Sequence, residues 1–292
     1  MDIGRLRRFR SLHITRRDFV VEVGSGNDPY WRSNLLIDKH VTDSAERPGG
    51  YMPLIIDRPF VVGDALHLPL QDRSVDFLVA RNILEHIVDV DAFIGEMMRV
   101  SRRGYIATPS ILSEKLFGWT KHVWFVSIDN GILKLRPKES PLHDPDLSKL
   151  FHPLYERNRS FRRFYKKNRK LFVVEYYWEG RIHYHAESNL DNLSKIKTTR
   201  AQFDFEGIRS ALVRRRQNVS LRQHIESAAR RFLSKTEIAR ATDVVNRLAC
   251  PICIGPLIVA KEGRVLACTK CTARYPVIEE VPILVREAAG RI

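Results

Sequence analysis

The sequence predicts a doubly wound α/β fold built on a mostly parallel sheet, with a smaller unit at the C-terminal end. Short apolar runs bounded by turn residues recur through the first half of the chain, at residues 19–23, 35–37, 60–62, 75–80 and 105–107. Such runs are typical of strands buried on both faces. Residues 82–100 repeat apolar side chains at intervals of three and four, the pattern of a helix packed on a sheet. Strands that alternate with helices indicate a parallel sheet.

The length and composition fit this fold and limit the class of protein. With 292 residues, the chain is long enough for one full α/β domain and a smaller one, and its 44% of hydrophobic residues is ordinary for a globular protein. No apolar run of about 18 residues occurs, and no hydrophobic signal core follows the N-terminal arginines, so we expect a cytoplasmic protein without a transmembrane segment. The net charge of +15 predicts an anionic partner such as RNA, an acidic glycan or a membrane surface.

We expect three consecutive parts in the chain. The α/β domain covers residues 1–188 and includes an aromatic and basic insertion, residues 109–170, on its substrate side. A basic helical connector covers residues 189–247, since this stretch is polar and its few apolar residues lie at roughly helical spacing. A small cysteine-containing unit covers residues 248–288.

The end of the α/β part holds a basic segment and a predicted hairpin. Eight of the fourteen residues from 157 to 170 are Lys or Arg, and three aromatic residues are interleaved with them: Phe161, Phe164 and Tyr165. This mixture suits phosphate contact and base stacking, which favours RNA, and equally suits a helix with a solvated face and a few core anchors. Residues 171–177 and 181–185 predict two strands joined by a tight turn.

A glycine-containing turn follows the first predicted strand. Gly24 and Gly26 carry no Cβ and therefore let the backbone approach a ligand closely at the carboxyl end of the sheet. Asp38 ends the second predicted strand, where a carboxylate can accept hydrogen bonds from both hydroxyls of a ribose, and Asp64 ends the third. This arrangement describes a nucleoside pocket. A complete Gly-x-Gly-x-x-Gly is absent, which disfavours a dinucleotide-binding oxidoreductase.

In this order, the motifs of residues 19–110 resemble those of class I S-adenosylmethionine (SAM) dependent methyltransferases, especially the group similar to ubiquinone- and menaquinone-pathway enzymes. Residues 68–77 and the run Asn-Ile-Leu-Glu-His at residues 82–86 resemble two further motifs of that family. The resemblance implies a SAM-dependent methyltransferase with a Rossmann-like sheet of the seven-stranded type. It also implies a set of cofactor-binding residues: Glu22, Gly24 and Gly26 in the first motif, Asp38 at the ribose, Asp64 and Ala65 beside the adenine, and Asn82. Asp28 stands where the family has its third glycine, so a non-catalytic SAM-binding or scaffold protein is an alternative.

The motifs that the chain lacks restrict the chemical class of the methyl acceptor. No Asn-Pro-Pro-Tyr or Asp-Pro-Pro-Tyr follows the fourth predicted strand, which argues against the amino groups of adenine or glutamine. All cysteines lie between Cys250 and Cys271, which leaves no nucleophile for pyrimidine C5 methylation and favours direct transfer. His122 is the candidate base because an imidazole titrates near neutral pH, at about 6.5, although it can equally pack a loop. We expect the acceptor to be an anionic macromolecule such as RNA or, alternatively, a glycan or lipid-linked precursor.

Four cysteines form the strongest local motif. Cys250 with Cys253, and Cys268 with Cys271, make two Cys-x-x-Cys pairs separated by 14 residues, a spacing suited to a closed, structural, tetrahedral zinc site. Residues 248–286 resemble the small zinc-ribbon activator subunit that binds and stabilises several methyltransferases, and its short bacterial relatives. The resemblance implies that this ribbon docks on the methyltransferase domain of the same chain.

Overall fold

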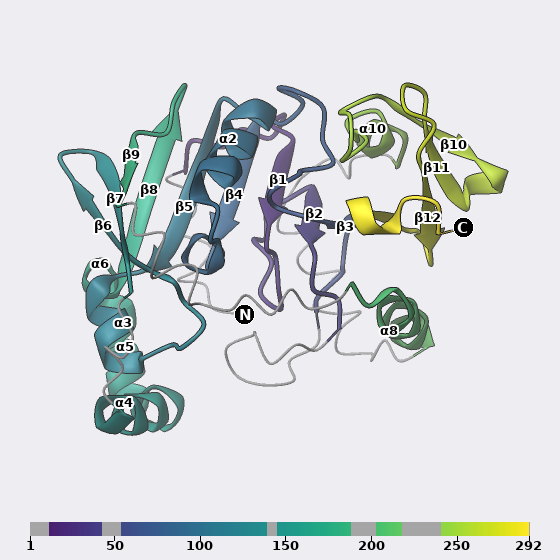
Figure 1. The fold of residues 1–292 in the computed structure, drawn as a ribbon. Helices are drawn as coiled ribbons and strands as arrows, with labels where there is room; N and C mark the ends of the chain where they lie inside the picture. Colours follow the sequence, from purple (N-terminus) through teal and green to yellow (C-terminus); the bar gives the residue numbers. More distant parts are fainter. Residues whose placement is uncertain (1–11, 43–53, 139–144, 188–202, 218–240, 292) are drawn as a thin grey trace.

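A ten-stranded sheet runs through the computed structural model, which describes residues 12–42, 54–138, 145–187, 203–217 and 241–291. Its central strands are β1 (Val20–Val23), β2 (Leu35–Asp38), β3 (Phe60–Gly63), β4 (Phe77–Arg81) and β5 (Arg103–Pro109). They are parallel and lie in the order β3-β2-β1-β4-β5 (Figure 1). The prediction of a mostly parallel central sheet is confirmed, but the whole sheet has ten strands rather than the seven expected. The carboxyl ends of these five strands meet at one edge, where ligands bind in open α/β sheets.

The described residues between β5 and residue 187 form four helices, a second sheet and one more strand of the first sheet. Its elements are α3 (Ile111–Phe117), β6 (Trp124–Asp129), β7 (Ile132–Pro137), α4 (Pro145–Arg157), α5 (Arg159–Lys167), α6 (Arg169–Phe172), β8 (Val173–Glu179) and β9 (Tyr184–Ala186). The two strands and the tight turn predicted for residues 171–185 are present, with Gly180 at a φ of 75° and an antiparallel bridge between Glu179 and Arg181. The strands themselves do not form a hairpin, because β8 pairs antiparallel with β5 and β9 pairs parallel with β7. Pairing with β5 buries Tyr176 and Trp178, which an isolated two-stranded hairpin does not achieve.

The basic segment of residues 157–170 forms α5 and the start of α6. No residue of α5 is buried, but its three aromatic rings contact rings of neighbouring helices. Phe161 lies 5.8 Å from Phe151, and Tyr165 stacks on Phe172 at 4.3 Å between ring centroids, whereas Phe164 is half exposed.

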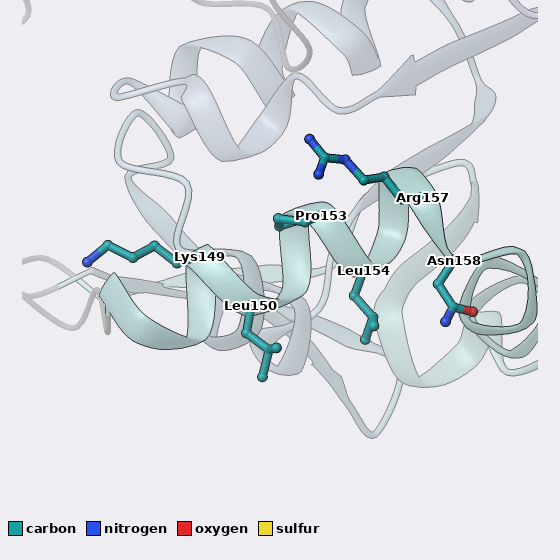
Figure 2. A pocket seen from close by; sticks show the side chains of 6 residues that line it. All are labelled: Lys149, Leu150, Pro153, Leu154, Arg157 and Asn158. Atoms are coloured by element: carbon teal, nitrogen blue, oxygen red, sulfur yellow. The ribbon is translucent and has the colours of Figure 1, made fainter.

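A cavity of about 400 Å³ lies on α4 and includes none of the residues at the strand ends. It is lined by Lys149, Leu150, Pro153, Leu154, Arg157 and Asn158 (Figure 2).

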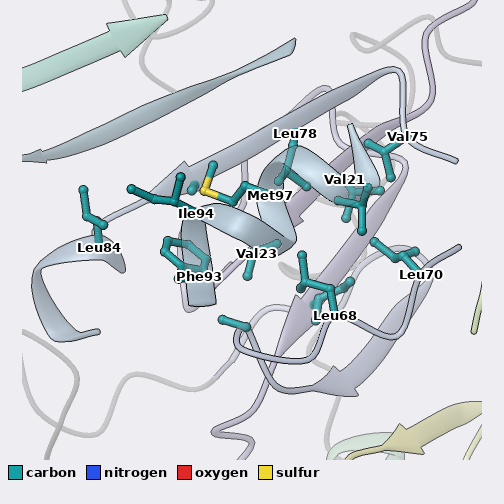
Figure 3. Packing of buried hydrophobic residues seen from close by; sticks show 14 of the residues in the cluster. Val21, Val23, Leu68, Leu70, Val75, Leu78, Leu84, Phe93, Ile94 and Met97 are labelled. Carbon is teal, nitrogen blue, oxygen red and sulfur yellow. The ribbon is translucent and has the colours of Figure 1, made fainter. Parts of the chain in front are cut away.

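A helix covers part of the central sheet. α2 (Val90–Val100) begins after Asp89, whose side chain accepts a hydrogen bond of 3.0 Å from a backbone N–H of the first turn. The prediction of one helix over residues 82–100 is therefore wrong at its start, where a separate 3-10 helix, η2 (Leu84–His86), precedes an extended Ile87. The apolar face of α2 packs on β1 and β4 through fully buried side chains: Phe93, Ile94 and Met97 against Val21, Val23 and Leu78 (Figure 3).

The C-terminal segment continues the sheet at the edge opposite β8 (Figure 1). It forms four antiparallel strands and two 3-10 helices: β10 (Leu257–Ala260), η3 (Lys261–Gly263), β11 (Val265–Cys268), β12 (Arg274–Ile278), β13 (Val281–Leu284) and η4 (Arg286–Ala288). β13 runs parallel to β3, with Ile283 beside Val62 and Leu284 beside Gly63. Without it, β3 would be an edge strand with unpaired backbone groups. The sequence did not predict this pairing.

Two described helices belong to the predicted connector, α8 (Phe205–Gln217) and α10 (Ala241–Val245). Residues 189–202 and 218–240 of that connector lie outside the described residues. α8 places Ile208 and Leu212 in the same buried cluster as Ile283 of β13. Within the described part of the chain, we find no helix with the length and apolar character required to cross a membrane.

Candidate functional site

The turn after β1 requires both of its glycines. Gly24 and Gly26 have positive φ angles of 69° and 52°, a region that residues with a Cβ rarely adopt. A Cβ on Gly24 would lie 2.8 Å from Cδ1 of Ile83, so the turn packs closely against the residues that follow β4. A Cβ on Gly26 would meet no described atom within 4 Å. Among the described residues, the space at the Cβ position of Gly26 is therefore free for a ligand, although Asp38 and Ile55 engage its backbone N–H and carbonyl.

A buried ion pair supports this turn. One carboxylate oxygen of Glu22 accepts hydrogen bonds of 2.9 and 2.7 Å from Arg81, and the other accepts one of 2.5 Å from the Tyr30 N–H. Burial raises the pKa of Glu22 although Arg81 opposes this shift. Arg81 also donates to the backbone carbonyl of Asp28 and lies 3.9 Å from its carboxylate. Glu22 thus holds the turn through Arg81, and the residue in the place of the third glycine has a charged partner.

Asp38 connects the end of β2 with the glycine turn. Its Oδ2 accepts a hydrogen bond of 2.9 Å from the Gly26 N–H, and its Oδ1 accepts one of 2.9 Å from the His40 N–H. An ionised carboxylate has about four acceptor positions, so two of them remain for hydroxyl donors. Asp38 can therefore still accept the two hydrogen bonds that the hydroxyls of a ribose would donate.

Asp64 follows β3 and forms an ion pair with Lys39, the residue after Asp38. The Lys39 ammonium lies 2.6 Å from Oδ2, and the Leu66 N–H donates to Oδ1 at 2.9 Å. Burial opposes ionisation of Asp64, but these hydrogen bonds outweigh it and hold the pKa of Asp64 below its ordinary value. Ala65 beside it is buried. This corner of the site therefore carries a fixed charge pair beside a small apolar side chain.

Asn82 turns the chain from β4 toward η2. It has a φ of 52°, which is uncommon for a residue other than glycine but more accessible to Asn than to most. Its N–H donates to the carbonyl of Ala107 at the end of β5, at 2.8 Å. Asn82 is exposed, and the next residue, Ile83, is the one that packs against Gly24. This backbone conformation thus places η2 close to the glycine turn.

Glu85, His86 and His122 form a polar cluster at the same edge of the sheet. One ligand-type atom of each residue lies within 4.8 Å of those of the other two, and the two imidazole centroids are 4.5 Å apart. Glu85 is buried; its Oε2 accepts a hydrogen bond of 2.9 Å from the Thr108 hydroxyl, whereas no described group donates to its Oε1. Burial raises the pKa of Glu85 to about 7 although His122 opposes it, and burial together with His122 lowers the pKa of His86 to about 3.

His122 is oriented by a chain of charged groups. Its Nδ1 lies 2.5 Å from Oε1 of the buried Glu114, whose Oε2 accepts a hydrogen bond of 2.8 Å from the Lys138 ammonium. The Trp119 ring stacks on the imidazole at 5.0 Å. Because Nδ1 is engaged by Glu114, Nε2 is the nitrogen that remains for a proton or a ligand.

The four cysteines come together in the C-terminal segment. The Sγ atoms of Cys250 and Cys271 are 3.6 Å apart, and those of Cys253 and Cys268 are 3.5 Å apart. Sulfur atoms at about 2.3 Å from a tetrahedral zinc ion are separated by about 3.8 Å, so this group could hold such an ion. Burial opposes ionisation of Cys268, but the N–H groups of Cys271 and Lys270 donate to its sulfur and lower its pKa to about 7.

The strand ends carry all the residues predicted to bind the cofactor: Glu22, Gly24, Gly26, Asp38, Asp64, Ala65 and Asn82. His122 lies just before β6, where the Val123 N–H donates to the carbonyl of Glu85 at 2.7 Å. Sequence reasoning missed the roles of Arg81, Glu85 and Glu114. A charged residue at the end of an apolar strand was a usable signal for Arg81, whereas no sequence signal connects Glu114 with the imidazole it orients.

Comparison with known proteins identifies a domain within the chain. Residues 37–107, which span β2 to β5, match the family model described as a methyltransferase domain. Ajmaline N-methyltransferase from Rauvolfia serpentina is 31% identical over 98 residues, which are 27% of this chain and 33% of that protein. Norajmaline N-methyltransferase from the same plant is 44% identical over 45 residues, or 15% of its length. The chain therefore spans a third or less of these two relatives.

A different similarity concerns a shorter protein. A UPF0434 protein of Francisella tularensis subsp. mediasiatica is 39% identical over 49 residues, which are 17% of this chain and 79% of that protein.

Among solved structures, a Haloferax volcanii complex that contains the Trm112 methyltransferase activator covers 62% of this chain and 90% of the matched chain, at 15% identity and a TM-score of 0.36. A SAM-dependent methyltransferase from Methanosarcina mazei covers 42% and 71%, at 18% identity and a TM-score of 0.28.

Proposed function

We propose a function for this chain, which contains a class I methyltransferase domain and over 49 residues belongs to the UPF0434 family. The protein transfers a methyl group from SAM directly to an acceptor that reaches the cluster of Glu85, His86 and His122. The observation that carries this proposal is the proximity of that cluster to the glycine turn, through Asn82 and η2, inside a segment that matches a methyltransferase domain.

SAM binds at the carboxyl edge of the sheet in this proposal. Its methionine part lies over the glycine turn on the side of Gly26, where no described atom fills the space of a Cβ, and its ribose hydroxyls donate to Asp38. Asp64 and Ala65 border the adenine. The exposed Asn82 completes the cofactor site, and Glu22 contributes by holding the turn. The relation of this domain to the ubiquinone- and menaquinone-pathway group is part of the same proposal.

His122 acts as the base when the acceptor is a hydroxyl. Its Nε2 takes the O–H proton, the acceptor oxygen bonds to the methyl carbon, and the electron pair of the broken C–S bond returns to sulfur as S-adenosylhomocysteine leaves. The Glu114 carboxylate on Nδ1 stabilises the imidazolium that forms. Positioning of the two reactants supplies the larger share of the rate enhancement.

The acceptor is an anionic molecule. The net charge of +15 and the solvent-facing basic residues of α5 support this class. Phe161 and Tyr165 pack on other aromatic rings, so α5 supplies phosphate or carboxylate contacts more readily than base stacking. RNA and an anionic glycan or lipid-linked precursor both carry such groups. A non-catalytic SAM-binding or scaffold protein is the alternative outside the enzyme class.

The C-terminal residues 248–288 form a zinc ribbon that stays on the methyltransferase domain of the same chain. Support comes from the sulfur distances within the four-cysteine group and from the pairing of β13 with β3. Zinc would be held by Cys250, Cys253, Cys268 and Cys271 and would supply structural stability only. Residues 1–188 are then the methyltransferase domain, with residues 109–170 as its insertion, and residues 189–247 are the connector.

Calorimetric titration with SAM tests the cofactor site. Asp38→Asn removes the carboxylate charge with little change in shape, and loss of charge-assisted hydrogen bonds of about 1.5–3 kcal/mol would weaken SAM binding by about 10- to 100-fold. Asp146→Asn is the matched control, because that side chain is 93% exposed on α4. Undiminished SAM affinity in Asp38→Asn would refute the ribose assignment.

Labelled SAM identifies the acceptor. The protein is incubated with radiolabelled SAM and a fractionated extract, and the label is then located in RNA, protein, glycan or lipid. Label that disappears on nuclease treatment supports RNA, whereas label that resists nuclease and extracts with glycan or lipid supports the alternative. SAM binding without any transfer would favour the scaffold function.

A further inference from the structure

The cluster of Glu85, His86 and His122 has more ligand chemistry than a base alone requires. Two imidazoles and one carboxylate, with one ligand-type atom each within 4.8 Å, are the donor set of the facial triads that bind divalent transition metals and leave coordination positions open. Ligand atoms around such an ion lie closer together than 4.8 Å, so small side-chain rotations would complete the site. This group is separate from the four-cysteine group.

Glu85 provides an independent indication of a ligand. Its side chain is about 1% exposed, and among the described residues nothing donates a hydrogen bond to Oε1. A buried carboxylate oxygen without a partner is costly, and such groups are usually paired with a charge or bound to a metal. A cation between Glu85 and the two imidazoles would remove this cost.

The surroundings of the cluster match the outer shell of metal sites. Metal-bound histidines usually donate their second ring N–H to a carboxylate, which fixes the nitrogen that faces the metal. Glu114 occupies that position on Nδ1 of His122, at 2.5 Å, and its own second oxygen is held by Lys138. The Thr108 hydroxyl holds Oε2 of Glu85 in the same manner.

We propose that Glu85, His86 and His122 bind a divalent transition metal ion such as Zn²⁺ or Fe²⁺, through one carboxylate oxygen and one nitrogen of each imidazole. Imidazole ligands favour these ions over Mg²⁺ and Ca²⁺, which prefer sites made of oxygen ligands. Nε2 is the ligand atom of His122, because Glu114 engages Nδ1.

The consequence for catalysis rests on the proposed methyltransferase function. An acceptor hydroxyl at an open position of the ion loses its proton to solvent more easily, because the cation stabilises the alkoxide. The alkoxide oxygen bonds to the methyl carbon of SAM, and the C–S electron pair returns to sulfur. With the ion present, His122 is a ligand, and the ion replaces it in activating the acceptor.

Cobalt loading of the full-length chain tests the site without reference to activity. Metal is removed with a chelator, Co²⁺ is added, and bound cobalt per chain is measured by mass spectrometry together with the visible spectrum. We expect two ions in the wild type: one with thiolate-to-cobalt charge transfer from the cysteines, and one with only the weak bands of nitrogen and oxygen ligands. His86→Ala and Glu85→Gln should each lose the second ion and keep the charge-transfer band. Glu114→Gln should weaken the second ion's binding by about 10- to 100-fold.

The controls separate this inference from a folding defect and from the proposed function. His152→Ala removes an imidazole outside the cluster and should retain both ions. His86 is only partly buried, so its variant should melt near the wild-type temperature even if Glu85→Gln unfolds. Wild-type protein with only the thiolate-bound ion, or His86→Ala with undiminished cobalt, would overturn the metal site. SAM calorimetry on the same samples is the separate test: absent SAM binding with both ions present overturns the methyltransferase proposal and leaves the metal site standing.

Discussion

Truncation of Leu284 tests whether the C-terminal strand stabilises the α/β domain. Leu284 lies in β13 beside Gly63 of β3 and is fully buried in the same apolar cluster as Ile37 and Val61. Leu284→Ala removes three carbon atoms, which is about 2.4 kcal/mol of transfer free energy at about 0.8 kcal/mol per methylene. The cavity left behind adds to this cost, so we expect the free energy of unfolding to fall by about 3–4 kcal/mol.

Tryptophan fluorescence measures this effect in the α/β part alone. All four tryptophans precede residue 188: Trp31, Trp119, Trp124 and Trp178. A loss of about 3 kcal/mol corresponds to a decrease of about 6–12 °C in the fluorescence-detected melting temperature. Ile258→Ala on β10 is the control, because that side chain is 53% exposed and its truncation should change stability by less than about 0.5 kcal/mol. A tryptophan transition that stays at the wild-type temperature in Leu284→Ala would refute the idea that β13 belongs to the cooperative unit of the domain.

Three further predictions concern zinc, packing and pH. Cys271→Ser should lower the zinc content measured by mass spectrometry and the melting temperature, and an unchanged value of both would contradict the zinc site. Gly104→Ala should lower the free energy of unfolding by about 2–3 kcal/mol in urea titrations, since its Cβ would lie 2.3 Å from the Leu78 carbonyl oxygen. Gly95→Ala in α2 has free space around its Cβ and should instead raise the free energy of unfolding by about 0.5–1 kcal/mol. Equal effects of the two substitutions would argue against the close packing of Gly104 on β4. The lowered pKa of Asp64 means that its ion pair stabilises above the ordinary pKa of 3.8 and is lost as pH falls through the folded value. Asp64→Asn should therefore cost about 0.5–1 kcal/mol at pH 7, and a cost that persists at about pH 2 would exclude this ion pair as its source.

The chain's local sequence determined the central strands and the two short motifs. Continuous apolar runs must be buried on both faces, so β1 to β5 follow from the pattern of residues within each run. The glycines of the turn after β1 have positive φ angles that few other residues adopt, and two Cys-x-x-Cys pairs need only two turns that face each other. Each of these features depends on neighbours in the sequence, which is why pattern and spacing were sufficient.

Only the tertiary structure decided the pairings and clusters between distant residues. β8 pairs with β5 rather than with β9, which follows it in the sequence, and β13 pairs with the edge of β3. The backbone groups of a strand pair with an edge that the rest of the fold leaves unpaired. Glu85 and His122 meet because β6 returns alongside η2, and Glu114 reaches the imidazole from α3. Long-range burial of charged groups has no local signature. The sequence therefore determined which central strands form and where the cysteines gather, while the tertiary structure decided which strand edges pair and which side chains share the candidate site.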